Sequence, residues 1–154
     1  MRGSAEVITL LNEVLTAELT AINQYYVHYK MCENWGYGKL ASKLREESIE
    51  EMKHADTLIA RILFLEGIPN MQRLNPIKVG ENVPEQMELD LALEVAAVER
   101  LNAGIQLCEE KNDAGTREML EHMLEDEEQA VDWHEAQLHL IGEIGKERYL
   151  AEQM

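Results

Sequence analysis

The placement of proline constrains the fold of this 154-residue chain more than any other feature. All three prolines fall within residues 69–84. Because proline interrupts helix interiors, this stretch separates two long flanks that can be helical throughout. Glycine divides each flank again, at Gly36 and Gly38 in the first and at Gly115 in the second.

Apolar residues recur at three- and four-residue steps in four segments, which is the spacing of one helix face. No segment shows the sustained alternation of a strand. Gly142 and Gly145 mark the end of the last long segment. The pattern predicts helices near residues 5–34, 39–66, 83–112 and 116–142, with a short fifth helix near 146–152.

The lengths of the connections predict the topology. The first and second helices are joined tightly, as are the third and fourth, so each pair is expected to form an antiparallel hairpin. Residues 67–82 are numerous enough to run the length of a bundle. Two hairpins joined by one long crossover describe a ferritin-like four-helix bundle rather than a simple up-down one. We therefore expect a single all-α domain over residues 1–154.

The net charge limits the kinds of molecule that the chain can bind. The chain has 30 acidic and 14 basic residues, a net charge of −16, which repels nucleic acid and anionic membranes and attracts cations. No apolar run is long enough to cross a membrane. The N-terminus lacks the apolar core of a secretory signal, and Cys32 and Cys108 form no disulfide framework. A cytoplasmic location is expected.

Charged and titratable residues interrupt the apolar stripes of all four long helices. A buried carboxylate without a partner is costly, and it usually becomes protonated or binds a metal. The residues concerned are Glu18, Glu51, His54, Glu94 and Glu127.

The spacing of these residues favours a metal site. Glu18 and Glu51 are 33 residues apart, as are Glu94 and Glu127, so antiparallel folding brings all four to one level. His54 follows Glu51 by three positions, which places both on one helix face. Four carboxylates and an imidazole suit two iron or manganese ions better than zinc. The competing hypothesis is an interaction bundle in which these residues form salt bridges and hold no metal.

The second hairpin departs from the ligand pattern of the first at one position. The counterpart of Glu51-x-x-His54 in the second hairpin ends at Ala130, which cannot bind a metal. His134 lies on the same stripe, but about 10 Å further along the helix axis from Glu127. His134, water or a displaced carboxylate could complete the site, although a buried, hydrogen-bonded histidine is the simpler reading of His134.

A second apolar line runs along the second helix, formed by Ile49, Met52 and Ile59. It points about 100° away from the core stripe and predicts a subunit interface. Met52 can fill that interface, or it can be a thioether ligand to a haem across a two-fold axis. The residues alone favour the first interpretation.

Almost the whole chain resembles the bacterioferritins, the haem-containing branch of the ferritin family. The resemblance is strongest in five stretches, at residues 18–25, 46–56, 61–70, 90–94 and 126–133. It implies a shell of 24 subunits, built from two-fold dimers, that stores ferric mineral, and a di-iron ferroxidase centre inside each bundle.

Residue roles follow from the same resemblance. It implies that Glu51 and Glu127 bridge two irons, that Glu18 and His54 complete one iron, and that Glu94 remains on the other. Met52 from two subunits would hold one haem b, which reverses the interpretation from the residues alone. Tyr25 would lie beside the irons and supply an electron, and Glu46 and Glu50 would guide iron toward the cavity. A ferredoxin-like reductant would serve iron release.

The family's second histidine is replaced by Ala130, so alternatives stay open. In the first, the ferroxidase site works with altered geometry. In the second, the chain is an impaired subunit that assembles with a second subunit type and supplies shell and haem. In the third, Ala130 is an engineered substitution. A di-iron oxidase or peroxidase of the rubrerythrin type is disfavoured, because the chain has no CxxC pair for an additional iron centre.

Overall fold

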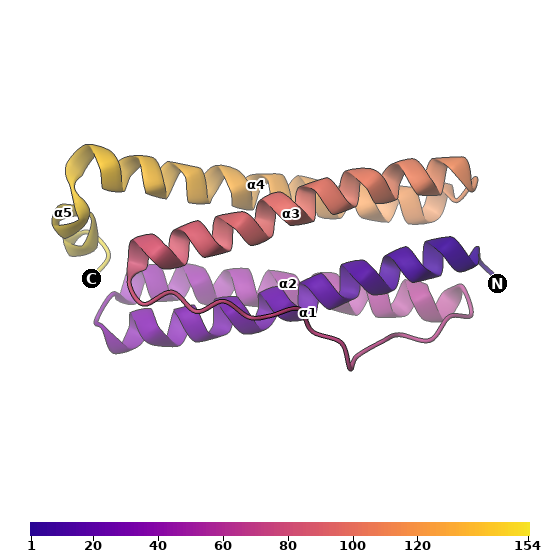
Figure 1. The fold of residues 1–154 in the computed structure, drawn as a ribbon, viewed down its shortest axis with the longest axis horizontal. Helices are drawn as coiled ribbons and strands as arrows, with labels where there is room; N and C mark the ends of the chain where they lie inside the picture. Colours follow the sequence, from indigo (N-terminus) through magenta and orange to yellow (C-terminus); the bar gives the residue numbers. More distant parts are fainter.

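Five helices and no strand make up the fold, which confirms the predicted ferritin-like bundle (Figure 1). The structure is a computed structural model that covers residues 1–154. The helices are α1 (Ala5–Asn34), α2 (Gly38–Phe64), α3 (Val83–Glu110), α4 (Ala114–Ile144) and α5 (Lys146–Ala151). None of them combines the length and apolarity needed to cross a membrane.

The end of α4 differs from the expected boundary. Gly142 lies inside the helix, which continues to Ile144. One glycine in a helix costs only about 1 kcal/mol relative to alanine, so packing can override it. Gly145 ends the helix because its φ of 86° lies in the left-handed region, which glycine adopts without strain.

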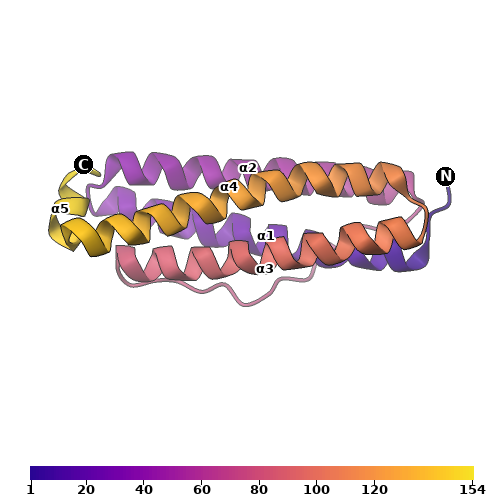
Figure 2. The ribbon, with the colours of Figure 1, turned by 90° about the horizontal axis from the view of Figure 1, so that it is seen from above.

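The long helices form two antiparallel hairpins, α1 with α2 and α3 with α4, that pack side by side (Figures 1 and 2). The segment between α2 and α3 runs back along the bundle, so that α3 begins at the end where α1 finishes. The short helix α5 closes that same end, and its Tyr149 is buried against the bundle.

Side chains of α1 hold the crossover in place. Backbone N–H groups of the crossover donate to three buried side chains that are one turn apart on α1. Asn75 donates to Thr20 Oγ1 at 2.9 Å, Lys78 to Gln24 Oε1 at 3.1 Å, and Gly80 to His28 Nε2 at 3.0 Å.

The buried apolar residues form two separate clusters. One, near the N-terminal end of α1, includes Leu11, Leu58, Ile62 and Leu120. The other, near α5, includes Leu40, Leu44, Met87 and Tyr149. A layer of buried polar side chains lies between them, midway along the bundle, and this layer contains the candidate site.

Candidate metal centre

Four buried side chains from three helices converge in the middle of the bundle. Glu18 comes from α1, Glu51 and His54 from α2, and Glu127 from α4. One potential ligand atom from each lies within 4.8 Å of all the others. The antiparallel hairpins thus bring together residues that are far apart in the sequence. Carboxylate oxygens and one imidazole nitrogen, gathered at this spacing, can bind a divalent cation.

His54 lies at the centre of this group. Its Nδ1 is 3.0 Å from Glu127 Oε1, 3.6 Å from Glu51 Oε2 and 3.7 Å from Glu18 Oε2. Its Nε2 donates to Asp126 Oδ2 at 2.9 Å. A carboxylate on the outer nitrogen orients the ring so that the inner nitrogen faces the other carboxylates, where an entering metal would displace its proton.

Two buried carboxylate oxygens at the centre have no hydrogen-bond partner. They are Glu18 Oε2 and Glu94 Oε2, whereas His54 Nδ1 and Glu127 Oε1 face each other at 3.0 Å. Buried polar atoms are normally satisfied, because leaving one unpaired costs about 1–3 kcal/mol. Unpaired atoms of metal-ligand type, aimed into one small volume, fit a site whose partner is a cation.

The protonation of the group is consistent with such a site. Burial raises the pKa of Glu18 to about 7 and outweighs the hydrogen bond from His54. Burial lowers the pKa of His54, but the carboxylates of Glu127, Glu18 and Asp126 raise it to about 11. A cation entering the group therefore displaces protons, as metal binding to acid and imidazole ligands requires.

Glu94 is buried on α3 and lies outside the group of four, although it lines one small cavity with Glu18, Glu51 and Glu127. Its Oε1 accepts a short hydrogen bond from the Tyr25 hydroxyl, and its Oε2 is free. Glu94 can therefore serve a second cation beside the first. Burial, followed by the charge of Asp90, raises the pKa of Tyr25, so its hydroxyl remains a proton donor.

The remaining predicted residues lie elsewhere. His134 is fully buried, but it is outside the group of four. Its Nδ1 donates to the Ala130 carbonyl at 2.7 Å, and its Nε2 has no partner. Glu46 and Glu50 are exposed on α2. Met52 is 49% exposed on the same helix, and Ile49 and Ile59 are half-buried.

Two groups of residues near the site were not predicted from the sequence. Asp126 directly precedes Glu127, and this adjacency was the only available signal for its contact with His54. Buried Asp90 lies one turn before Glu94 on α3 and accepts from Gln24 Nε2 and His28 Nδ1, each at 2.9 Å. These bonds join α1 to α3 close to Glu94, and nothing in the periodicity of either helix indicates them.

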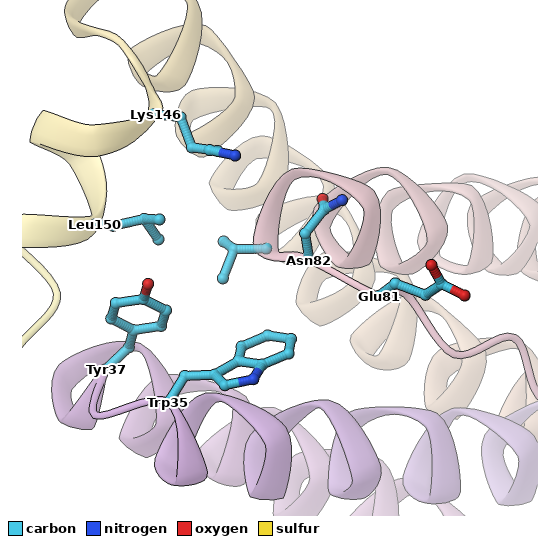
Figure 3. Close-up of a pocket in the computed structure, with 7 residues that line it drawn as sticks. Trp35, Tyr37, Glu81, Asn82, Lys146 and Leu150 are labelled. Carbon is cyan, nitrogen blue, oxygen red and sulfur yellow. The ribbon is translucent and has the colours of Figure 1, made fainter.

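A larger cavity of about 260 Å³ lies at the α5 end of the bundle (Figure 3). Two aromatic rings, Trp35 and Tyr37, line it together with Glu81, Asn82, Lys146 and Leu150. One carboxylate beside one ammonium group is not a metal-ligand set, so the mid-bundle group remains the candidate metal centre.

Comparison with known proteins gives a consistent result. Residues 8–144 match the ferritin-like domain. The chain is 49% identical over 152 residues to a bacterioferritin of Mycobacterium leprae, covering 99% of this chain and 96% of that protein. It is 46% identical over 149 residues to a bacterioferritin of Brucella melitensis, covering 97% and 92% of the two chains. A bacterioferritin of Rhodobacter capsulatus is 47% identical over the same length and coverage.

Proposed function

The chain belongs to the bacterioferritins of the ferritin-like family, which store iron, and from this premise we propose that it oxidises Fe(II) at the mid-bundle centre, with dioxygen or peroxide as the electron acceptor, before storing it as ferric mineral. The observation that carries this proposal is the convergence of Glu18, Glu51, His54 and Glu127 within 4.8 Å, together with buried carboxylate oxygens of Glu18 and Glu94 that have no hydrogen-bond partner. A purely structural salt-bridge network would leave no buried carboxylate oxygen without a hydrogen-bond partner.

Each residue has a distinct part in the proposed reaction. Glu18 and His54 hold one substrate Fe(II), Glu94 holds the other, and Glu51 and Glu127 bridge them. The buried carboxylates offset the charge of the two cations and exclude water from around them. Tyr25, bonded to Glu94, would lie beside the second ion and supply a further electron to the dioxygen or peroxide that the two Fe(II) reduce.

The oxidised iron needs an enclosed volume. The bacterioferritin relatives imply a shell of like subunits, and we propose 24 copies arranged as two-fold dimers, with a second subunit type as the alternative composition. Carboxylates on the surface lower the potential energy of an approaching cation. We assign this guiding role to Glu46 and Glu50 on α2, whose side chains are exposed.

We further propose that Met52 binds haem b at the two-fold contact between two copies. Its thioether is half exposed, and Ile49 and Ile59 lie on the same side of α2 as apolar neighbours, so a haem edge would be sheltered there. A bound haem supplies electron transfer to stored iron. The Met52 thioethers of the two copies would hold this haem between them.

Stopped-flow oxidation of Fe(II) by the iron-free assembled protein tests the ferroxidase proposal. At two Fe(II) per chain we expect a fast phase that saturates, since only the mid-bundle centre is filled. Glu18→Ala should abolish this phase, because the first ion loses a buried carboxylate. A saturating phase of equal size in Glu18→Ala would contradict the assignment of the site.

The haem proposal has a separate readout. Met52→Leu preserves side-chain volume and removes the thioether, so the haem absorption bands should disappear while the assembled size on gel filtration is unchanged. Haem bands of normal intensity in this variant would rule out Met52 as the ligand.

Ala130 favours a second candidate function, in which this subunit contributes the shell and the haem without rapid oxidation. Slow oxidation with no saturating phase would support that alternative. In that case Ala130→His, which restores an imidazole next to the second ion, should accelerate oxidation.

A further inference from the structure

A cavity of about 170 Å³ lies directly beside Ala130, between α2 and α4. Two proposed iron ligands, Glu51 and His54, form its inner wall. The carboxylates of Glu47 and Glu50 line the same cavity. The space beside Ala130 is therefore open to carboxylate side chains from α2.

The second cation position has too few ligand atoms. Glu94 Oε2 is unpartnered, and Glu94 and Glu127 are each only 1% exposed. Glu18 and His54 belong to the first position. The second position is therefore left with Glu94 and the two bridging carboxylates, and it lacks one ligand on the side of Ala130.

Glu47 is placed to fill that gap. It precedes Glu51 by four residues, so both side chains lie on the same face of α2. Its side chain is only 12% exposed. Glu47 and Ala130 line the same cavity, so the Glu47 carboxylate can approach the second cation position from the side of Ala130.

Glu50 is less suitable, although it lines the same cavity. It is adjacent to Glu51 in the sequence, so it projects about 100° around the helix from it. Its side chain is 48% exposed and pairs with Lys53 at 3.0 Å. The two carboxylates therefore differ in the direction in which they project from α2.

We propose that Glu47 supplies the ligand that Ala130 lacks, so that Glu47, Glu51, Glu94 and Glu127 hold the second cation through oxygen atoms alone. This inference rests on the proposed function of the mid-bundle centre. An all-oxygen set selects hard divalent cations, whereas the first position with its imidazole also accepts softer ones.

Binding requires the Glu47 side chain to turn away from the cavity wall. In the structure its carboxylate pairs with Lys43 Nζ at 3.0 Å. A partly exposed ion pair of this kind contributes little to stability, so it opposes the movement weakly. Lys43 keeps a partner, because its ammonium group also lies 5.2 Å from the centre of the Trp133 ring.

Co(II) titration of the iron-free assembled protein tests the proposal without any oxidation chemistry. Bound metal is counted by equilibrium dialysis, and its coordination is followed by visible absorption. We expect two Co(II) per chain in the wild type and one in Glu47→Gln. Glu128→Gln removes the same charge from an exposed position on α4 outside this cavity and should keep both ions.

A rescue variant separates ligand loss from misfolding. Adding Ala130→His to Glu47→Gln should restore the second ion, with a nitrogen ligand evident in the absorption spectrum. Two ions in Glu47→Gln, or equal losses in the Glu47 and Glu128 variants, would overturn the inference. One ion in the wild type would overturn it while leaving the first position intact, whereas no bound ion would contradict the proposed function as well.

Discussion

A single exposed carboxylate, Asp126, orients the buried imidazole of His54 in the candidate metal centre. It accepts from His54 Nε2 at 2.9 Å, and this bond directs Nδ1 toward Glu18, Glu51 and Glu127. Asp126→Ala should weaken Co(II) binding at the first position about 10- to 100-fold, the usual effect of removing such a support. Isothermal titration calorimetry measures the Co(II) affinity of each variant. Glu125→Ala, an exposed neighbour, is the control, and equal affinities in the two variants would refute the role of Asp126.

At the scale of the helix, Asp113 joins the start of α4 to the end of α2. Its carboxylate accepts from the Thr116 amide at 3.0 Å, from the Thr116 hydroxyl at 2.6 Å and from Arg61 at 3.1 Å. Asp113→Ala should destabilise the protein by about 1–2 kcal/mol, as loss of a helix N-cap does. Thermal melting should show a decrease of about 3–8 °C. A change below 1 °C would show that the cap is dispensable.

The pH dependence of this contact has a definite sign. Burial raises the pKa of Asp113, but the hydrogen bonds from Thr116 and the Arg61 charge outweigh it and hold the pKa below its usual 3.8. The ionised form is therefore favoured by folding, so the contribution is complete above pH 3.8 and is lost as the pH falls through the lower folded value. The stability difference between wild type and Asp113→Asn should accordingly shrink in acid, as measured by denaturant unfolding.

The helices were predictable from the sequence because each one carries its own signals. Apolar spacing indicates the buried face of α1 without reference to any other helix, and the confined prolines indicate the crossover. Glu18, Glu51, His54 and Glu127 were also predictable, because matched spacing in two hairpins implies one common level. The bond from Tyr25 to Glu94 and the position of Glu47 were not predictable. Both depend on side-chain rotamers and on how the two hairpins pack, which no single helix encodes.

For the whole molecule, we expect metal binding to stabilise the fold, because the candidate ligands lie in the polar layer that separates the two apolar clusters. A ligand present at about 100 times its dissociation constant stabilises the folded state by about 2.7 kcal/mol. Co(II) should therefore raise the melting temperature by about 5–10 °C, and a chelator should reverse the change.

The same coupling should depend on pH. The raised pKa values of Glu18, about 7, and His54, about 11, mean that protons compete with the metal in acid. The stabilisation by Co(II) should therefore be larger at pH 8 than at pH 5.5. Calorimetric melting at the two pH values measures this, and an equal shift at both would show that these residues release no protons on binding.

The crossover also sets the axial register between the two hairpins. Its backbone is bonded at Asn75, Lys78 and Gly80 to successive turns of α1, and it leads directly into α3. Inserting or deleting one residue between Gly80 and α3 would shift α3 by roughly 3.3 Å, the length of one extended residue. Glu94 would then no longer lie level with Glu18, although every ligand would be present and both hairpins could remain helical. The number of residues in the crossover therefore determines whether the ligands of the candidate metal centre lie at the same level.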